Sequence, residues 1–327
     1  MNFDLLKKLR EEQLISAESF EKMEQQHAQP LFSLHWELKT LLYLGVMLLS
    51  TGLGILIYQN IDTIGHQVIL LIIASICGAC FFYCFKQKLP FSRERVKSPG
   101  SFFDYALLLG SLSFLTFVGY IQFQYQLFGT NYGLATFIPM VVLFFLAYEF
   151  DHLGLLSLAI TNLALWMGVS VTPKQLLMSS NYDNQTIIYT YILLALLLLA
   201  ADFAGRRFKV KEHFGFTYMH FGIHIGFIAL LAGYFIHYEF AIAYLFLLGV
   251  FALGVYIYRE AIARQSFYFL MLTVLYGYIA ISCLVMRALF NAGDGEGAFF
   301  LGFFYFIASA VSIIILLIRL NKKIKTA

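Results

Sequence analysis

Ten long apolar segments dominate this sequence of 327 residues. Each is close to the roughly 20 mostly apolar residues that a helix needs to cross the hydrocarbon core of a bilayer. A backbone in lipid must satisfy its own hydrogen bonds, which a helix does locally, whereas barrel strands would be shorter and would alternate polar with apolar residues. The sequence therefore predicts transmembrane helices. The segments are Thr40–Tyr58, Gln67–Phe85, Phe102–Ile121, Tyr132–Phe150, Leu153–Val171, Thr186–Ala204, Phe216–Phe235, Ala241–Tyr258, Phe267–Met286 and Ala298–Ile318.

The composition indicates that lipid is the solvent for much of this surface. Hydrophobic residues make up 60% of the chain and charged residues 13%, whereas a soluble domain has about 45–50% and about 25%. The net charge of +3 is small, and no basic tract is interleaved with aromatic residues. We expect the lipid bilayer as a partner and no nucleic acid.

The 22 lysines and arginines are distributed unevenly between the loops. All but two of them, Lys174 and Arg287, lie before the first segment, after the last one, or in loops that follow an even-numbered segment. The positive-inside rule then places these loops and both termini in the cytoplasm. The predicted fold is an all-α, polytopic membrane bundle of about ten transmembrane helices, with cytoplasmic N and C termini.

The segments divide the chain into three parts. Residues 1–38 are predicted to form a short, amphipathic, cytoplasmic helical region, residues 39–319 the transmembrane bundle, and residues 320–327 a basic cytoplasmic tail. The first part is too short to fold alone. We expect it to pack on the membrane part or to dock a cytoplasmic protein partner, and we expect the basic loops to attract anionic lipid headgroups.

Three features near the start of the chain carry a resemblance to a known family. They are Leu14-Ile15-Ser16, the run Leu41–Gly45 leading into Gly52–Ile55, and the turn Asn60-Ile61-Asp62, where family members often have Asn-Trp-Asp. Over roughly residues 1–80, the chain resembles the bacterial predicted membrane proteins grouped as domain of unknown function 2157. The resemblance implies a multi-pass protein of the bacterial inner membrane, and it implies no activity and no catalytic residues.

Two histidines in the seventh segment are the sharpest candidates for chemistry. His220 and His224 are spaced i, i+4, so both imidazoles lie on one face of a helix, a spacing that can chelate a metal. Ionisable groups inside spans usually face a bundle interior or water. The pair predicts a metal or proton site. The alternative, which we favour, is two neutral histidines that hydrogen-bond across helices or lie at headgroup level.

Acidic residues and a third histidine fall at the predicted cytoplasmic helix ends. With His220 and His224 they would surround the inner mouth of the bundle. They are Asp104, Glu149, Asp151, His152 and Asp202.

Each acid also has a plainer interpretation. Ser101-x-x-Asp104 is a capping pattern at a helix start, and Asp202 can pair with Arg206 four residues later. Glu149 has no cation within a turn, so it is either a functional acid or a solvated one.

An asparagine and three cysteines inside the spans are weaker candidates for a functional site. Asn162, near the middle of the fifth segment, could line a substrate path, but we favour an interhelical hydrogen bond. Cys77, Cys80 and Cys84 form one stripe, and we interpret them as small buried hydrophobic residues rather than as a metal or redox site.

We derive three hypotheses for function. The first is a passive or proton-coupled transporter of a small or lipidic solute, supported by the helix count, a kink expected at Pro139, and the polar groups Asn162, His220 and His224. The second is a non-catalytic membrane scaffold or sensor that docks a cytoplasmic partner. The third is a membrane-embedded enzyme with a cytoplasm-facing site of His and acids. We favour a protein that is not an enzyme and predict no cofactor.

Overall fold

The computed structural model describes Glu12, Ser16 and residues 35–59, 65–129, 131–171, 185–292 and 295–326. Over these residues the secondary structure is helical, with ten α-helices, one 3-10 turn and no strand. The two short helices predicted before residue 38 lie outside the described residues. The prediction of an all-α, polytopic fold is confirmed.

The chain divides into two compact units, Met1–His66 and Gln67–Ala327. The described helix of the first unit is α3 (His35–Gln59). The second unit contains the helices α5 (His66–Gln87), α6 (Ser101–Tyr125), α7 (Tyr132–Phe150), α8 (Leu153–Val171), α10 (Gln185–Arg207), α11 (Gly215–Ile236), α12 (Ile242–Ala263), α13 (Phe267–Ala292) and α14 (Gly295–Thr326), and the 3-10 turn η1 (Glu212–Phe214).

Nine of the ten predicted segments lie within one of these helices, and Ala241–Tyr258 begins one residue before α12, with Ala241 at the N-cap position. Eight of the ten helices are long and apolar enough to cross a membrane over their described residues, whereas α3 and α8 contain shorter apolar stretches, Thr40–Gly52 and Leu153–Gly168. Helix α7 continues through Pro139. Helix α14 continues to Thr326, so the residues expected to form a separate basic tail extend the last helix.

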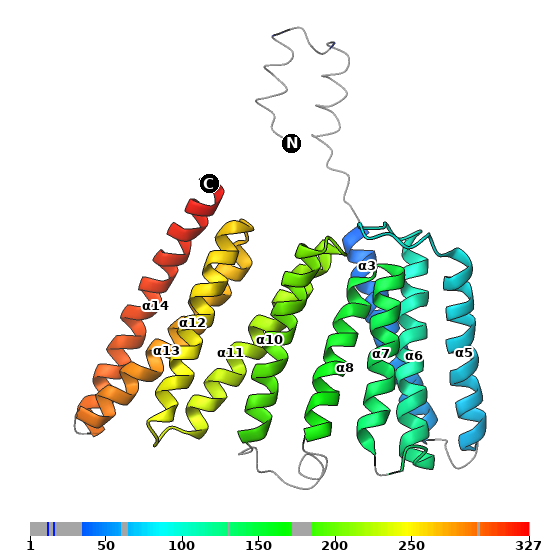
Figure 1. The fold of residues 1–327 in the computed structure, drawn as a ribbon, viewed down its shortest axis with the longest axis horizontal. Helices are drawn as coiled ribbons and strands as arrows, with labels where there is room; N and C mark the ends of the chain where they lie inside the picture. The colour runs from blue at the N-terminus through cyan, green and yellow to red at the C-terminus, as the bar shows by residue number, and fades with distance from the viewer. Residues whose placement is uncertain are drawn as a thin grey trace. The chain divides into compact units, whose positions relative to one another are not determined.

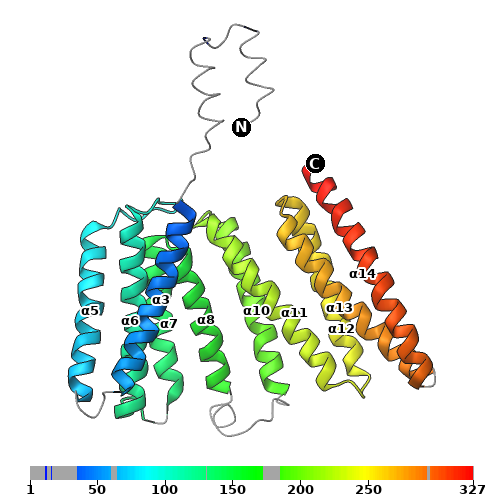
Figure 2. The same ribbon diagram turned by 180° about the vertical axis from the view of Figure 1, so that it is seen from behind.

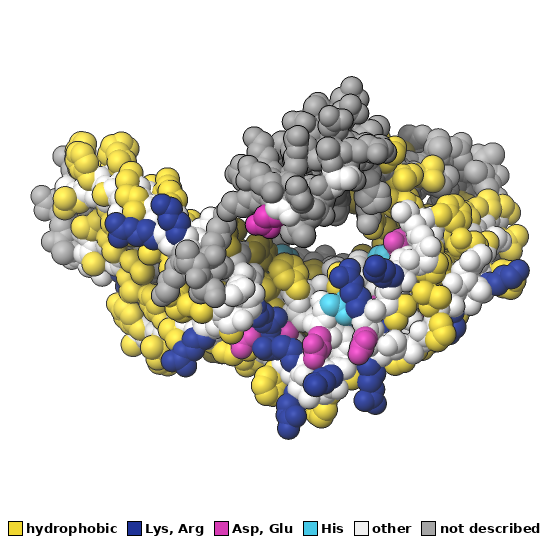
Figure 3. Space-filling model, turned by 90° about the horizontal axis from the view of Figure 1, so that it is seen from above, with side chains coloured by type: hydrophobic (Ala, Val, Ile, Leu, Met, Phe, Trp, Pro, Cys, Tyr) yellow, Lys and Arg dark blue, Asp and Glu magenta, His cyan; other side chains and the backbone are white. Residues whose placement is uncertain are grey.

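Consecutive helices of the second unit lie side by side and run in alternating directions (Figure 1, Figure 2). We call the end at which α5, α7, α10 and α12 finish the basic end. Figure 3 looks onto this end, where Lys, Arg, Asp, Glu and His side chains gather. At the opposite end α11 is joined to α12, and α13 to α14.

Two clusters of buried apolar side chains form the core of the second unit. One contains residues of α5 to α8 together with Leu194 and Leu198 of α10. The other joins α10 to α13 around Phe227 and Tyr234 of α11. Helices α10 and α11 contribute to both clusters and therefore hold the unit together. Large apolar side chains along α14, such as Phe303, remain exposed, as a lipid-facing surface requires.

Candidate functional site

A fully buried ion pair lies at the basic end. Helix α7 ends at Asp151, whose left-handed backbone (φ 55°) turns the chain into α8. Its carboxylate lies 3.0 Å from Lys211 Nζ, and both side chains are only 1% exposed. The same carboxylate lies 2.5 Å from His213 Nε2 and accepts the Val96 N–H. Because its oxygens have three partners, Asp151 is neutralised and fixed in place.

Lys211 also fixes the connection between α5 and α6. Its backbone N–H donates to the Arg93 carbonyl (2.8 Å) and its Nζ donates to the Glu94 carbonyl (3.4 Å). The ammonium lies 5.2 Å from the centre of the Phe91 ring, a cation–π distance. One lysine thus joins three connections, α5–α6, α7–α8 and α10–α11.

A second charged network joins α10 to α12. Asp202 Oδ2 accepts hydrogen bonds from Arg206 Nη2 (2.9 Å) and from Arg264 Nη2. Glu260 Oε2 accepts from Arg206 Nη1 (2.9 Å) and Arg264 Nε (3.1 Å). The predicted pair between Asp202 and Arg206 is present, within a closed arrangement of two acids and two arginines. Gly215 packs so closely that an added Cβ would overlap Asp202 Oδ1.

Glu149 obtains a cation from a distant part of the sequence. Lys88 Nζ lies 2.5 Å from Glu149 Oε1, with the lysine side chain 38% exposed and the glutamate 19% exposed. The absence of a cation within one helical turn therefore did not indicate an unpaired acid.

Asp104 lies in the first turn of α6, and its predicted capping role is wrong. The helix begins at Ser101, with Gly100 at the N-cap position and no side-chain cap. Ser101 is already helical, so its hydroxyl does not occupy the position from which a cap bonds the free N–H groups. Asp104 Oδ1 instead lies 3.9 Å from His152 Nε2, beyond hydrogen-bonding distance.

The two histidines of α11 join a chain of hydrogen bonds with tyrosines of α13. His220 Nδ1 lies 2.6 Å from the Tyr268 hydroxyl, which lies 3.3 Å from His224 Nε2. His224 Nδ1 lies 2.8 Å from the Tyr276 hydroxyl. The two imidazole centres are 4.8 Å apart. The hydrogen bonds connect these residues in the order Tyr276, His224, Tyr268, His220.

The predicted ring of acids and histidines does not form one site among the described residues. Over these ranges no hydrogen bond or ion pair joins His220 or His224 to Asp104, Glu149 or Asp202, which have the contacts given above. The described part of the chain also contains no group of three or more His, Cys, Asp or Glu residues placed to hold a metal ion.

Asn162 forms a hydrogen bond within its own helix, and the cysteines form no disulfide. The Asn162 amide donates to the Leu158 carbonyl of its own helix (3.0 Å), and the interhelical hydrogen bond that we favoured is not found over the described residues. A carbonyl four residues earlier lies within reach of a short polar side chain. The four cysteines are free, and Cys84 is buried with its Sγ 4.0 Å from the Phe103 carbonyl oxygen.

Sequence reasoning missed several groups that the structure singles out. No neighbouring residue in the sequence indicates that Lys211 is buried, because its partner Asp151 lies 60 residues away. Tyr268 and Tyr276 lie about two turns apart on α13. The sequence does not show that they meet His220 and His224, because this depends on how α11 and α13 pack. Arg287 did have a signal, since it is one of two cations outside the basic loops.

The fold and the lipid-compatible surface define a polytopic helical membrane protein. Residues 7–156 match the model of a family described as "Predicted membrane protein (DUF2157)". The match confirms the resemblance predicted from residues 1–80 and extends it through α7. No curated protein and no solved structure matches the chain.

Proposed function

We propose that the protein is a proton-coupled transporter of a small or lipidic solute. The observation that supports this function best is the hydrogen-bonded chain of Tyr276, His224, Tyr268 and His220 between two membrane-spanning helices. Chains of ionisable groups inside a membrane are typical of proton relays.

This series of hydrogen bonds can hold its protons in two self-consistent arrangements. In one, the Tyr276 hydroxyl donates to His224 Nδ1, His224 Nε2–H donates to Tyr268, and the Tyr268 hydroxyl donates to His220 Nδ1. In the other, every donor and acceptor is exchanged, because a neutral imidazole has one donor and one acceptor nitrogen and a hydroxyl can play both roles. Conversion of the first arrangement into the second moves one proton in at Tyr276 and one out at His220 Nε2.

An apolar pocket supports the lipidic class of solute. It lies between α10, α11 and α12 with a volume of about 500 Å³, and Leu199, Phe203 and Leu230 are among its lining residues. Gly226 and Gly249 also line it. A concave, largely apolar site of this size can hold a drug-sized or acyl-chain ligand.

Proteoliposomes with a pH-sensitive dye inside would test the relay. Short-chain fatty acids, amines and lysophospholipids would be added in turn while the internal pH is followed. We expect at least one class to drive proton flux, and we expect Tyr268→Phe to abolish it because a phenyl ring cannot pass a proton between the two histidines. The control Tyr305→Phe also removes one interhelical hydrogen bond of α13, to Ser282 (3.0 Å), and should retain flux. Equal flux in both variants would exclude the relay.

We also infer that the protein lies in the bacterial inner membrane with both termini in the cytoplasm. The clustering of cations in the basic loops supports this orientation. In a cysteine-free background, an impermeant maleimide applied to intact spheroplasts is expected to label Glu239→Cys, in the α11–α12 turn, and not Ser98→Cys, in the α5–α6 loop. The opposite pattern would reverse the orientation.

The structure gives less support to the other two hypotheses. An enzyme at the basic end would need an available acid, but three of the four candidate acids, Glu149, Asp151 and Asp202, pair with lysine or arginine. The fourth, Asp104, has His152 as its nearest charged partner, at 3.9 Å. The scaffold hypothesis depends on residues 1–38, most of which lie outside the described residues. Deletion of residues 1–30 is expected to leave proton flux intact if the transporter is correct, and to release a co-purifying partner if the scaffold is correct.

A further inference from the structure

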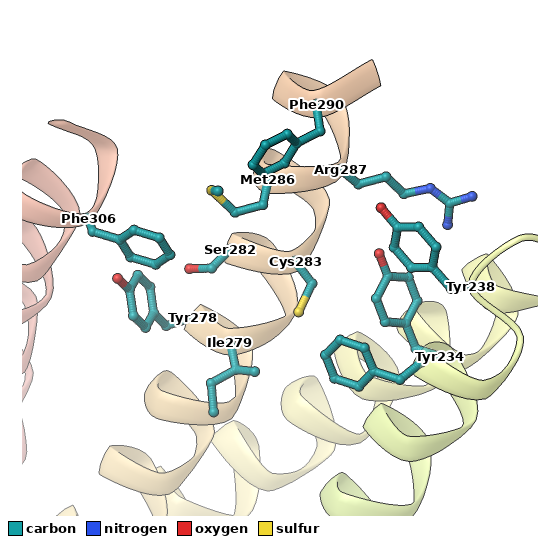
Figure 4. Close-up of a pocket in the computed structure, with 11 residues that line it drawn as sticks. Tyr234, Tyr238, Tyr278, Ile279, Ser282, Cys283, Met286, Arg287, Phe290 and Phe306 are labelled. Carbon is teal, nitrogen blue, oxygen red and sulfur yellow. The ribbon is translucent and has the colours of Figure 1, made fainter. Parts of the chain in front are cut away.

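Arg287 lies in an aromatic pocket at the opposite end of the second unit from the basic loops. The pocket has a volume of about 350 Å³ and is formed by α11, α13 and α14 (Figure 4). Most of its lining is apolar or aromatic, with Ile279, Met286, Phe290 and Phe306 among the residues. A cation in such surroundings needs a partner, because charged groups are costly to remove from water.

Two tyrosine rings hold the guanidinium group of Arg287. Its central carbon lies 4.4 Å from the centre of the Tyr238 ring and 4.7 Å from that of Tyr244. Both distances are within the range of cation–π attraction. The two rings therefore attract the guanidinium but accept none of its N–H groups in a conventional hydrogen bond.

Several buried polar atoms of this pocket form no hydrogen bond of good geometry over the described residues, although Tyr234 and Arg287 interact with each other. Arg287 Nε and Nη1 and the Tyr234 hydroxyl are buried and lack a hydrogen-bond partner in the described part of the chain. Figure 4 shows the hydroxyls of Tyr234 and Tyr238 directed toward Arg287. Leaving buried donors unpaired lowers stability, and more so for charged groups.

Other polar groups of the pocket wall do have partners. The Tyr278 hydroxyl lies 3.0 Å from Ser309 Oγ, and Ser282 Oγ lies 3.0 Å from the Tyr305 hydroxyl. The unsatisfied groups are thus confined to the guanidinium and the adjacent Tyr234. At the basic end Arg206 Nε also lacks a hydrogen-bond partner in the described part of the chain, but Arg206 and Arg264 both bind carboxylates. No ion pair with an acid is found for Arg287 within the described ranges.

We propose that this pocket binds the phosphate of an anionic phospholipid, with Arg287 and Tyr234 as donors. A phosphate oxygen pair matches the planar fork of an arginine, which favours bidentate binding of phosphate. Arg287 lies near the C-terminal end of the α13 span, and interfacial depth is where a lipid phosphate lies. The exposed apolar face of α14 beside the pocket gives the acyl chains a surface to follow.

The charge of the pocket favours a headgroup without an ammonium. Among the described residues its lining includes Arg287 and no acid, and Glu239 in the nearby turn is exposed and does not line it. A phosphatidylglycerol headgroup would neutralise Arg287, whereas phosphatidylethanolamine would bring a second cation without a partner. The site is separate from the proposed relay, because Tyr234 lies near the end of α11 and His220 near its start.

Lipid titration of the full-length protein in neutral detergent micelles tests the proposal. Thermal unfolding would be followed while phosphatidylglycerol, phosphatidylcholine or inorganic phosphate is added, and bound lipid would be counted by native mass spectrometry. We expect phosphatidylglycerol to raise the melting temperature by roughly 3 °C or more and the other two additives to have little effect. Equal stabilisation by inorganic phosphate would overturn the lipid as the source of the anion.

Three variants locate the site. Arg287→Gln is expected to weaken phosphatidylglycerol binding about tenfold to a hundredfold, the range expected for loss of charge-assisted hydrogen bonds. Arg287→Lys and Tyr234→Phe retain most of the packing and should each weaken binding several-fold, so the proposal remains testable if Arg287→Gln folds poorly. The control Arg319→Gln removes an exposed cation of α14 and should bind as the wild type does. Wild-type affinity in all three pocket variants would overturn the site, and would leave the transport proposal unaffected.

Discussion

Replacing Lys211 with methionine is expected to lower the free energy of unfolding by about 3–5 kcal/mol, the usual cost of removing one partner of a buried ion pair. The side chains of Lys211 and Asp151 are each 1% exposed, so water cannot solvate the carboxylate that is left. Methionine keeps an unbranched stem beside Phe91 and isolates the loss of charge. The remaining contacts of Asp151 with Val96 and His213 place the expected cost toward the lower end of this range.

The control applies the same substitution to an exposed pair. Lys88 is 38% exposed where it meets Glu149, and exposed ion pairs contribute less than about 1 kcal/mol. Unfolding in mixed micelles with increasing dodecyl sulfate, followed by tryptophan fluorescence, would compare Lys211→Met with Lys88→Met. We also expect the double variant Asp151→Asn, Lys211→Met to lose less than the sum of the two single losses, because the two residues are in contact. Equal losses for Lys211→Met and Lys88→Met would refute the assignment of the buried pair.

Two further predictions concern the helix α11 and its histidines. Gly215→Ala should cost about 1–3 kcal/mol in the same unfolding assay, because the new Cβ would overlap Asp202 Oδ1, whereas Gly277→Ala, with nothing within 4 Å of the new Cβ, should cost little. Washed protein is expected to contain no stoichiometric zinc, because His224 uses both ring nitrogens, and His220 one, in hydrogen bonds to tyrosines; one equivalent of zinc by elemental analysis, lost in His224→Ala, would contradict this.

The helices could be predicted from the sequence because the apolar run itself decides where a chain enters lipid. Tyr132–Phe150 and Leu153–Val171 were predicted with the bounds that α7 and α8 have. The other helices extend beyond their apolar runs, as at α14, which continues to Thr326. Polar residues such as Lys322 and Lys323 end the apolar run, but they are good helix formers and do not end the helix.

The charged contacts could be predicted only where they are local. Asp202 and Arg206 lie on one face of one helix, so their spacing was sufficient. The partners Asp151 and Lys211 meet only because the α7–α8 turn and the α10–α11 connection pack together, and no sequence pattern gives that packing. For Asn162 the sequence pointed to a neighbouring helix, whereas its amide donates to the carbonyl of Leu158 in its own helix.

The cations therefore have two different physical roles, which the sequence distribution alone does not separate. At the basic end, Lys211, Arg206 and Arg264 are neutralised by acids of the same unit, so these cations stabilise helix ends and are poor candidates for ligand binding. Arg287 lies at the opposite end, away from the basic loops, and its Nε and Nη1 are buried without a hydrogen-bond partner over the residues that the structure describes. An anion supplied by the membrane would pair with these N–H groups and remove the cost of burying them. Arg287, which lies outside the basic loops, is therefore the cation best suited to bind an external ligand.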